Sequence, residues 1–303
     1  MSALVILFFA IVMVMRVLQS AFSKKVAVCM PEGMSAYMRY IEISYYFSSA
    51  FCVLTLLLAR DFSGFNAEAI LIAAVSGCFL ALSSLSGMKS LLGGTIVLSS
   101  VFSTAGLIIP CILGAIFFNE PLSVLQVIFI IVLLASTTLL MKSSKDIFGA
   151  LTPKTMFWLI VGFVSNGAVL FCPKLFGMRQ PEGNVSLFSL LTFLIPALFI
   201  SLYSLMMRAK AHESKEEKEK SKLPKQLIGY AVILAFAVFV IQQLVTLLTP
   251  AVSSAVRFTI VNGGATVIAA IVGAAMYEEK LTVRSVLGIV LSVGAMVLIK
   301  VFE

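Results

Sequence analysis

Long apolar runs, divided by short polar breaks, follow one another from one end of the chain to the other. Runs of about 18 or more apolar residues are long enough to cross a hydrocarbon core of about 30 Å as a helix. Lipid offers no hydrogen-bond partners to a bare backbone, so only helices or closed barrels cross it, and these runs lack the alternation of barrel strands. The pattern therefore predicts an all-α membrane protein.

Ten transmembrane helices are predicted from the positions of these runs. They lie at residues 3–22, 35–59, 68–88, 91–118, 122–141, 155–173, 185–207, 227–248, 251–277 and 282–302. The first run lacks the basic start and the small-residue cleavage site of a signal peptide, so we expect it to be the first span. Only the break at residues 208–225 is long, and its dense mixture of both charge signs predicts a solvated surface loop.

The two halves of the chain repeat each other. The tripeptide Pro-Glu-Gly occurs at residues 31–33 and again at 181–183, an offset of 150 residues. The segment LGAIFFNEPLSV at 113–124 aligns with VGAAMYEEKLTV at 272–283, an offset of 159 residues, and the longer loop at 208–225 accounts for the difference. Because five spans is an odd number, the second copy enters the membrane from the opposite side. We therefore predict two inverted five-helix repeats, at residues 1–146 and 147–303, a layout typical of transporters.

Composition agrees with a membrane protein and disfavours an enzyme. Hydrophobic residues make up 60% of the 303 residues and charged residues 12%, where soluble domains carry roughly 25% charged residues. The five cysteines are scattered singly, the one histidine lies in the charged loop, and both aspartates lie in breaks. These residues form no catalytic or metal-binding pattern, so we expect no enzyme, no cofactor, no metal site and no nucleic-acid partner.

Lysine and arginine segregate between the two sides of the predicted membrane. Fifteen of them lie in or beside the breaks after odd-numbered spans, and four lie on the other side. The positive-inside rule therefore predicts that the richer side is cytoplasmic and that both termini are extracytoplasmic.

The end of each half resembles a known transporter repeat. The segments GAIFFNEPLSV and GAAMYEEKLTVRSVLGIVLSVGAMVLIK resemble the end of the EamA repeat of the drug/metabolite transporter superfamily, and Pro31 ahead of Arg39 resembles its start. The resemblance covers both halves and implies ten helices, a central cavity and alternating access for a small metabolite, in a bacterial inner membrane. The chain departs from the family in two ways. Its predicted orientation is opposite to the usual one. The tryptophan-glycine pair common in the first helix of the family is missing, because the only tryptophan is Trp158, in the sixth span.

The acidic residue of each junction has a structural interpretation. Glu120 and Glu279 lie at the ends of spans, where a carboxylate can cap the following helix together with Ser123 or Thr282. We therefore expect them to stabilise helix ends rather than to bind substrate.

Charged residues inside the first two spans are candidates for a substrate site. A charge at the bilayer centre costs at least ~2.5–3.5 kcal/mol, so it needs a partner or a water-filled cavity. Arg16 lies inside the first span, and Gln19 follows on the same helix face. Arg39 and Glu42 are spaced to pair near the start of the second span, and snorkelling to the interface is the alternative for Arg39. We assign all four to the predicted site.

The second half adds further polar residues to this site. Arg257 lies inside the ninth span, ahead of Asn262 and two adjacent glycines that allow close helix contact or a local break. The matching stretch of the fourth span carries no charge, so Arg257 is predicted to serve a ligand, with a hydrogen bond between helices as the alternative. Asn166 and Gln242 complete the predicted site.

The charged residues inside the predicted spans indicate the class of substrate. Three arginines inside the spans face one acid, Glu42, which favours an anionic or amino-acid-like solute. We predict a secondary transporter that exports a small polar metabolite through a central cavity by alternating access. The alternatives are a structural or sensory membrane protein without transport and a translocator of a lipid or lipid-linked substrate. Membrane lipid is an expected partner, and association of two copies is left open.

Overall fold

The computed structural model describes residues 3–31, 34–64, 66–92, 102–103, 105–120, 122–140, 152–211, 223–277 and 282–302. Within these ranges the chain forms helices and their connections, without any strand. The all-α prediction is therefore confirmed for the part of the chain that the structure describes.

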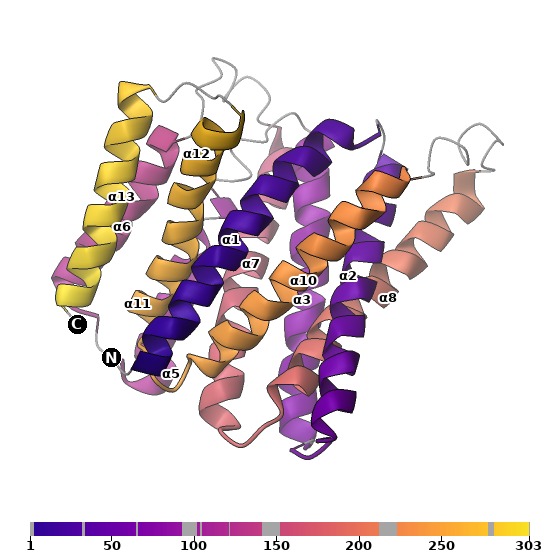
Figure 1. Cartoon of the computed structure of the whole chain (residues 1–303), viewed down its shortest axis with the longest axis horizontal. Helices are drawn as coiled ribbons and strands as arrows, with labels where there is room; N and C mark the ends of the chain where they lie inside the picture. Colours follow the sequence, from indigo (N-terminus) through magenta and orange to yellow (C-terminus); the bar gives the residue numbers. More distant parts are fainter. Residues whose placement is uncertain are drawn as a thin grey trace.

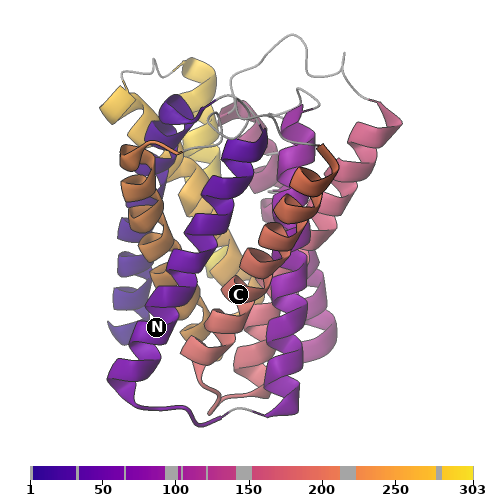
Figure 2. The same cartoon turned by 90° about the vertical axis from the view of Figure 1, so that its right-hand side faces the viewer.

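The helices pack side by side as one bundle (Figures 1 and 2). In chain order they are α1 (Ala3–Cys29), α2 (Met34–Ala59), α3 (Ala67–Leu92), α5 (Ile108–Phe118), α6 (Val124–Leu140), α7 (Pro153–Arg179), α8 (Val185–Ala211), α10 (Lys225–Leu247), α11 (Ser254–Phe258), the π-helix η1 (Thr259–Gly263), α12 (Gly264–Tyr277) and α13 (Val283–Val301).

The surface of the bundle is apolar, as lipid requires. Seven described helical stretches are long and apolar enough to cross a membrane: α1, α2, α3, α7, α8, α10 and Ser254–Met276, which includes η1. Shorter apolar helices occupy Ile108–Phe118, Val124–Ser136 and Ser285–Val301. Large apolar side chains point outward, for example Leu58 at 77% exposure and Ile116 at 66%. Such a surface is unfavourable in water, which indicates an integral membrane protein.

Short polar side chains cap several helices at their first turns. Thr152 accepts a hydrogen bond from the backbone N–H of Thr155 at the start of α7, with Pro153 at the first helical position. Ser123 and Gln126 form a reciprocal capping box at the start of α6, at 3.0 and 3.1 Å. Thr282 caps α13 in the same way as Thr152 caps α7, as the sequence predicts.

Both chain termini lie toward the same end of the bundle (Figure 1). The connection between α2 and α3 meets the connection between α7 and α8 at this end, where the Asn184 side-chain amide donates to the Asp61 carbonyl at 2.8 Å. Gly64 has a φ of +72°, and a Cβ there would lie 3.1 Å from the Asn184 backbone nitrogen. Glycine is thus required both by the backbone angle and by the close approach of the two connections. We call this end the terminal end, and the end where α1 finishes and α2 begins the opposite end.

Several helices continue beyond their predicted ends, α1 and α7 by the most residues. α1 runs to Cys29 instead of residue 22, because the helical backbone continues through Lys24 and Lys25. α7 runs to Arg179 instead of residue 173, passing through Pro173 and Lys174. Hydropathy marks where lipid contact ends, whereas backbone hydrogen bonding continues for as long as polar side chains find solvent or partners.

The predicted ninth span is a helix with a local change of winding. α11 leads into η1, and α12 follows at Gly264. A Cβ on Gly263 would lie 3.1 Å from a Leu133 side-chain carbon, and one on Gly264 would lie 3.1 Å from the Met13 sulfur. The adjacent glycines therefore accompany both a change in backbone winding and close helix contact. Residues 93–101 and 104 of the predicted span at 91–118 lie outside the described residues, and α5 forms the end of that span.

Candidate functional site

A polar pocket of about 360 Å³ lies among α1, α2, α3 and α10. Its described lining consists of Gln19, Ser23, Tyr37, Tyr40, Ile41, Ser44, Tyr45, Ser48, Leu80, Ser83, Ser84, Gly87, Leu234, Ala235 and Val238. We call it the hydroxyl pocket, because three tyrosines and five serines line it. No residue in this lining carries a formal charge at neutral pH.

Helix geometry directs these side chains into one pocket. On α2 the lining positions recur at spacings of three and four residues from Tyr37 to Ser48, which places them on one helix face. On α3 Leu80, Ser83, Ser84 and Gly87 follow the same rule. Most of the lining belongs to the later part of α1 and α3 and to the earlier part of α2, so the pocket lies toward the opposite end.

Hydrogen bonds within the protein already use the protons of several pocket hydroxyls. Ser44 donates to the Tyr40 carbonyl at 2.8 Å, and Ser84 donates to the Leu80 carbonyl at 3.0 Å. Tyr45 and Ser84 lie 2.7 Å apart. Since the Ser84 proton goes to Leu80, Tyr45 is the donor in this pair. Ser48 donates to the carbonyls of Ser44 and Ala235.

Tyr40 is different from these residues. Its side chain is 8% exposed, and its hydroxyl has no hydrogen-bond partner among the described residues. A buried hydroxyl without a partner costs free energy, and the pocket that it lines is where a ligand or water could satisfy it.

Three residues predicted for the site come together beside this pocket. Arg16 donates to the Gln19 side-chain oxygen at 2.8 Å and to the Asn262 side-chain oxygen at 3.5 Å. Because Arg16 is only a donor, it fixes the Gln19 oxygen and leaves the Gln19 amide nitrogen as the group that can donate elsewhere. Gln19 lines the hydroxyl pocket, whereas Arg16 lies behind it.

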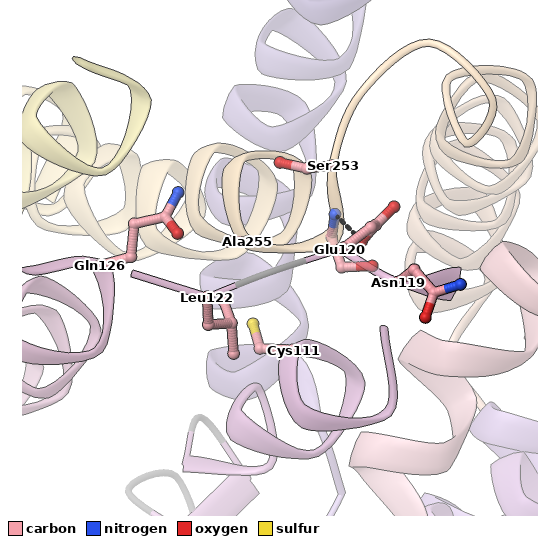
Figure 3. A pocket seen from close by; sticks show the side chains of 8 residues that line it. Cys111, Asn119, Glu120, Leu122, Gln126, Ser253 and Ala255 are labelled. Atoms are coloured by element: carbon pink, nitrogen blue, oxygen red, sulfur yellow. Dashed lines mark hydrogen bonds between the residues drawn. The ribbon is translucent and has the colours of Figure 1, made fainter. Parts of the chain in front are cut away.

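A buried ion pair lies at the terminal end. The Lys174 ammonium is 2.6 Å from one Glu120 carboxylate oxygen, and it also donates to the carbonyls of Thr249 and Val252 at 2.9 and 3.2 Å. The other Glu120 oxygen accepts from the Ser254 backbone N–H at 2.9 Å (Figure 3). We call these five residues the junction cluster. It joins α7, the connection between α5 and α6, and the connection between α10 and α11.

The prediction that Glu120 caps the helix directly following it is therefore wrong. Ser123 and Gln126 cap the helix that follows Glu120, while Glu120 caps α11, which lies 134 residues further along the chain. Partial burial raises the pKa of Glu120, but hydrogen bonds from Lys174 and Ser254 outweigh it and hold the pKa below its usual value of 4.5. Glu279 lies outside the described residues.

A second, smaller pocket of about 230 Å³ adjoins the junction cluster. Glu120, Ser253 and Ser254 line it, and the Cys111 sulfur points toward it from α5 (Figure 3). Cys111 is only 2% exposed and belongs to the apolar core that fills the terminal end around α1, α5, α10 and α11. Apolar packing and the ion pair therefore lie together at this end.

Arg257 is fully buried at the edge of the junction cluster. It donates to the Val245 carbonyl at 3.3 Å, and its guanidinium lies 4.1 Å from the Phe258 ring centre. Its Nε and one terminal nitrogen have no hydrogen-bond partner among the described residues. Arg257 lines neither pocket, so the structure does not bring it into the hydroxyl pocket with Gln19.

The other predicted site residues lie apart from the hydroxyl pocket. The expected pair of Arg39 with Glu42 is wrong for the described residues, because Arg39 is exposed and Glu42 accepts from the Ser201 hydroxyl of α8 at 2.6 Å. Asn166 donates to the Ser103 carbonyl at 2.6 Å and so holds α7 to a neighbouring segment. Gln242 lies one turn beyond Val238 on the same face of α10, outside the described lining.

The tyrosines and serines of the pocket were missed because the sequence argument followed charge. Their signal was present in the sequence as a polar stripe along one face of the second span, from Tyr37 to Ser48. Lys174 lies one residue beyond the predicted span at 155–173, whereas in the structure it lies inside α7 and is 1% exposed.

Comparisons with known proteins address the fold alone. No family model matches the chain, and no curated protein matches it. A solved structure described as "Crystal structure of protein" is similar over 97% of both chains, with a TM-score of 0.72 and 11% sequence identity. At this identity the likeness shows a shared fold.

Proposed function

We propose that the chain is a secondary transporter that carries a small polar solute across the membrane by alternating access. The observation that carries the proposal is a polar pocket inside an otherwise apolar bundle, together with a buried ion pair and apolar packing at the terminal end. A pocket near one end and a barrier at the other are the two features that alternating access requires of one of its states.

The inverted repeat is part of this proposal, and the pairing of helices supports it. If α1, α2, α3, α5 and α6 match α7, α8, α10, the α11–α12 helix and α13, then exchanging the halves turns one set of contacts into another. The contact of α1 with α10 becomes that of α7 with α3, and the contact of α1 with α12 becomes that of α7 with α5, and all four occur. The contacts of α2 with α8 and of α6 with α13 are unchanged by the exchange. We therefore propose ten spans in two halves, 1–146 and 147–303, and membership of the EamA group.

Orientation follows from charge and from the arrangement of the ends. From the positive-inside rule applied to the lysine-rich breaks, we propose that the terminal end lies outside the cytoplasm. The hydroxyl pocket then lies toward the cytoplasm, which suits an exporter that loads its solute there. We propose a bacterial inner membrane as its location, by resemblance to the EamA group.

Transport is tested by reconstitution of the full chain into liposomes preloaded with single solutes, followed by counterflow of the labelled solute. The panel comprises amino acids, organic acids and uncharged sugars. We expect counterflow of at least one solute, reduced by Arg16→Ala and unchanged by the control Arg179→Ala, which alters an exposed arginine at the end of α7. Reconstituted, folded protein that exchanges no solute would favour a structural or sensory role, and movement of labelled lipid alone would favour a lipid translocator.

The same counterflow assay tests the anionic or amino-acid-like substrate that the arginines predict. Arg16 reaches the hydroxyl pocket through Gln19, and Arg257 lies at the terminal end. If Arg16→Ala and Arg257→Ala both carried an acidic solute at the rate of the unaltered protein, that substrate class would be wrong.

A further inference from the structure

The hydroxyl pocket has a specific hydrogen-bonding character that follows from its internal bonds. The oxygens of Ser44, Tyr45, Ser48 and Ser84 have each given their single proton to a group in the protein. A hydroxyl that has donated its proton keeps its lone pairs and can only accept. A ligand can therefore bond to these four oxygens only by donating.

Five other groups in the lining can donate, because the Gln19 amide nitrogen and the hydroxyls of Ser23, Tyr37, Tyr40 and Ser83 give no proton to any described residue. The Gln19 amide nitrogen is free to donate because Arg16 holds the Gln19 oxygen. The Tyr40 hydroxyl is buried without a partner among the described residues and can both donate and accept. The ligand must therefore also accept hydrogen bonds.

An anion fits this pattern poorly. A carboxylate or phosphate is rich in acceptors and, when fully ionised, has no proton to offer the four accepting oxygens. The described lining also contains no cation, and an unpaired charge is costly inside a membrane. Arg16 attracts an anion through its charge but offers it no hydrogen bond, because Gln19 lies between Arg16 and the pocket.

An organic cation meets the opposite difficulty. It could donate to the accepting oxygens and lie over a tyrosine ring. However, no carboxylate belongs to the described lining, and the Arg16 guanidinium lies one hydrogen bond away behind Gln19. Like charges at this separation disfavour binding.

We propose that the hydroxyl pocket binds an uncharged, ring-shaped group rich in hydroxyls, as in a monosaccharide or cyclic polyol. A hydroxyl donates and accepts at once, which matches both kinds of group in the lining. Tyr37, Tyr40 and Tyr45 provide aromatic surface for the apolar face of such a ring. A pocket of about 360 Å³ suits one small ring. This inference deepens the proposed transport function and replaces the anionic substrate for this pocket.

Binding is measured by the thermal unfolding midpoint of the full chain, since a ligand of the folded state raises that midpoint. The protein is purified in a detergent without a sugar headgroup, because a maltoside headgroup would compete. D-glucose and myo-inositol are the uncharged probes, D-glucuronate is the anionic probe, and D-glucosamine at pH 6 is the cationic probe. We expect a concentration-dependent rise with at least one uncharged probe and none with the charged probes.

Two variants test whether the rise in the unfolding midpoint comes from binding in the hydroxyl pocket. Tyr45→Phe removes an accepting oxygen, and we expect roughly 2- to 10-fold weaker binding of the uncharged probe. Tyr46→Phe is the matched control, because Tyr46 is the next residue of α2, bonds to Ser201 and does not line the pocket. Equal effects of the two variants would overturn the assignment, as would binding of glucuronate or glucosamine at least as tight as that of the uncharged probes, or no binding of either uncharged probe.

A sugar headgroup on a lipid offers the same chemistry as a free sugar. Octyl glucoside and D-glucose distinguish the sources, since stronger binding of the glucoside assigns the site to a lipid headgroup and equal or weaker binding assigns it to a soluble solute. Failure of transport is recognised separately. Glucose binding without counterflow would support the proposed pocket chemistry and contradict the proposed transport function. Counterflow of an acid without glucose binding would support transport and contradict the proposed pocket chemistry.

Discussion

The Lys174 ammonium lies 2.6 Å from the Glu120 carboxylate, at a point where three segments of the bundle meet. The side chain of Lys174 is 2% exposed and that of Glu120 is 21% exposed, so the pair is shielded on the lysine side and reachable on the other. Carbonyls of the connection after α10 also accept hydrogen bonds from the ammonium. The pair thus joins the two proposed halves of the protein at the terminal end.

Replacing Lys174 by methionine should destabilise the protein. The substitution leaves the Glu120 carboxylate and two carbonyls without their cation, and loss of one partner of a buried pair typically costs ~3–5 kcal/mol. Because Glu120 is partly exposed, we expect ~1–3 kcal/mol, measured by thermal unfolding in detergent.

The double variant Lys174→Met/Glu120→Gln should recover part of this loss, because it removes the unpaired charge as well. Lys154→Met, which alters an exposed lysine at the start of α7, is the control. A Lys174→Met protein as stable as the control would contradict the structural importance of the pair.

The ion pair also predicts a dependence of stability on acid. The pKa of Glu120 in the folded protein is below its usual 4.5, so the pair adds stability above that pH. This contribution is lost as the pH falls from about 4.5 through the lower folded pKa. We expect unfolding midpoints between pH 7 and 3 to fall less steeply in Glu120→Gln than in the unaltered protein, and identical slopes would refute the assignment.

Close packing beside the junction cluster makes one glycine essential. A Cβ on Gly177 would collide with the Thr249 side chain and lie 3.2 Å from the Thr246 carbonyl oxygen. We expect Gly177→Ala to cost ~1–3 kcal/mol in thermal unfolding. Gly229→Ala is the matched control, since nothing lies within 4 Å of its Cβ position on α10, and helix propensity should make it neutral or stabilising by up to ~1 kcal/mol.

Much of the fold could be predicted from hydropathy, because lipid imposes one simple requirement on each span. The predicted spans at 35–59 and 185–207 agree closely with α2 and with the start of α8. The end of α7 could not be predicted in this way. Lys174 resembles a residue at the membrane surface until its partners are known, and these come from residues 54 to 78 positions away in the chain.

The candidate site was predicted only in part for a related reason. The association of Arg16 with Gln19 followed from helix spacing, and its contact with Asn262 depends on how α1 packs against η1. The hydroxyl pocket depends on four helices meeting, and its tyrosines and serines carry no charge that would single them out within one span. Charge identifies residues that need partners, whereas the shape of a pocket is a tertiary property.

The position of Arg16 predicts an effect on ligand binding that is separate from charge attraction. Arg16→Met should release the Gln19 oxygen, let the amide turn over, and weaken binding of an uncharged polyol by roughly 2- to 10-fold. Gln19→Leu should weaken it similarly, and the double variant should add little, because both changes remove the same oriented donor. Fully additive effects, measured by thermal shift, would contradict a positioning role for Arg16.

Alternating access is tested most directly by the accessibility of two cysteines in liposomes of known protein orientation. Cys111 is retained, the other four cysteines are replaced by serine or alanine, and a second protein carries Ser83→Cys in place of Cys111. We predict that a membrane-impermeant maleimide labels the Ser83→Cys protein faster from the opposite end. Addition of Lys174→Gln should slow that labelling and speed the labelling of Cys111 from the terminal end. Equal labelling of the Ser83→Cys protein from both ends, or no effect of Lys174→Gln on either cysteine, would contradict the account.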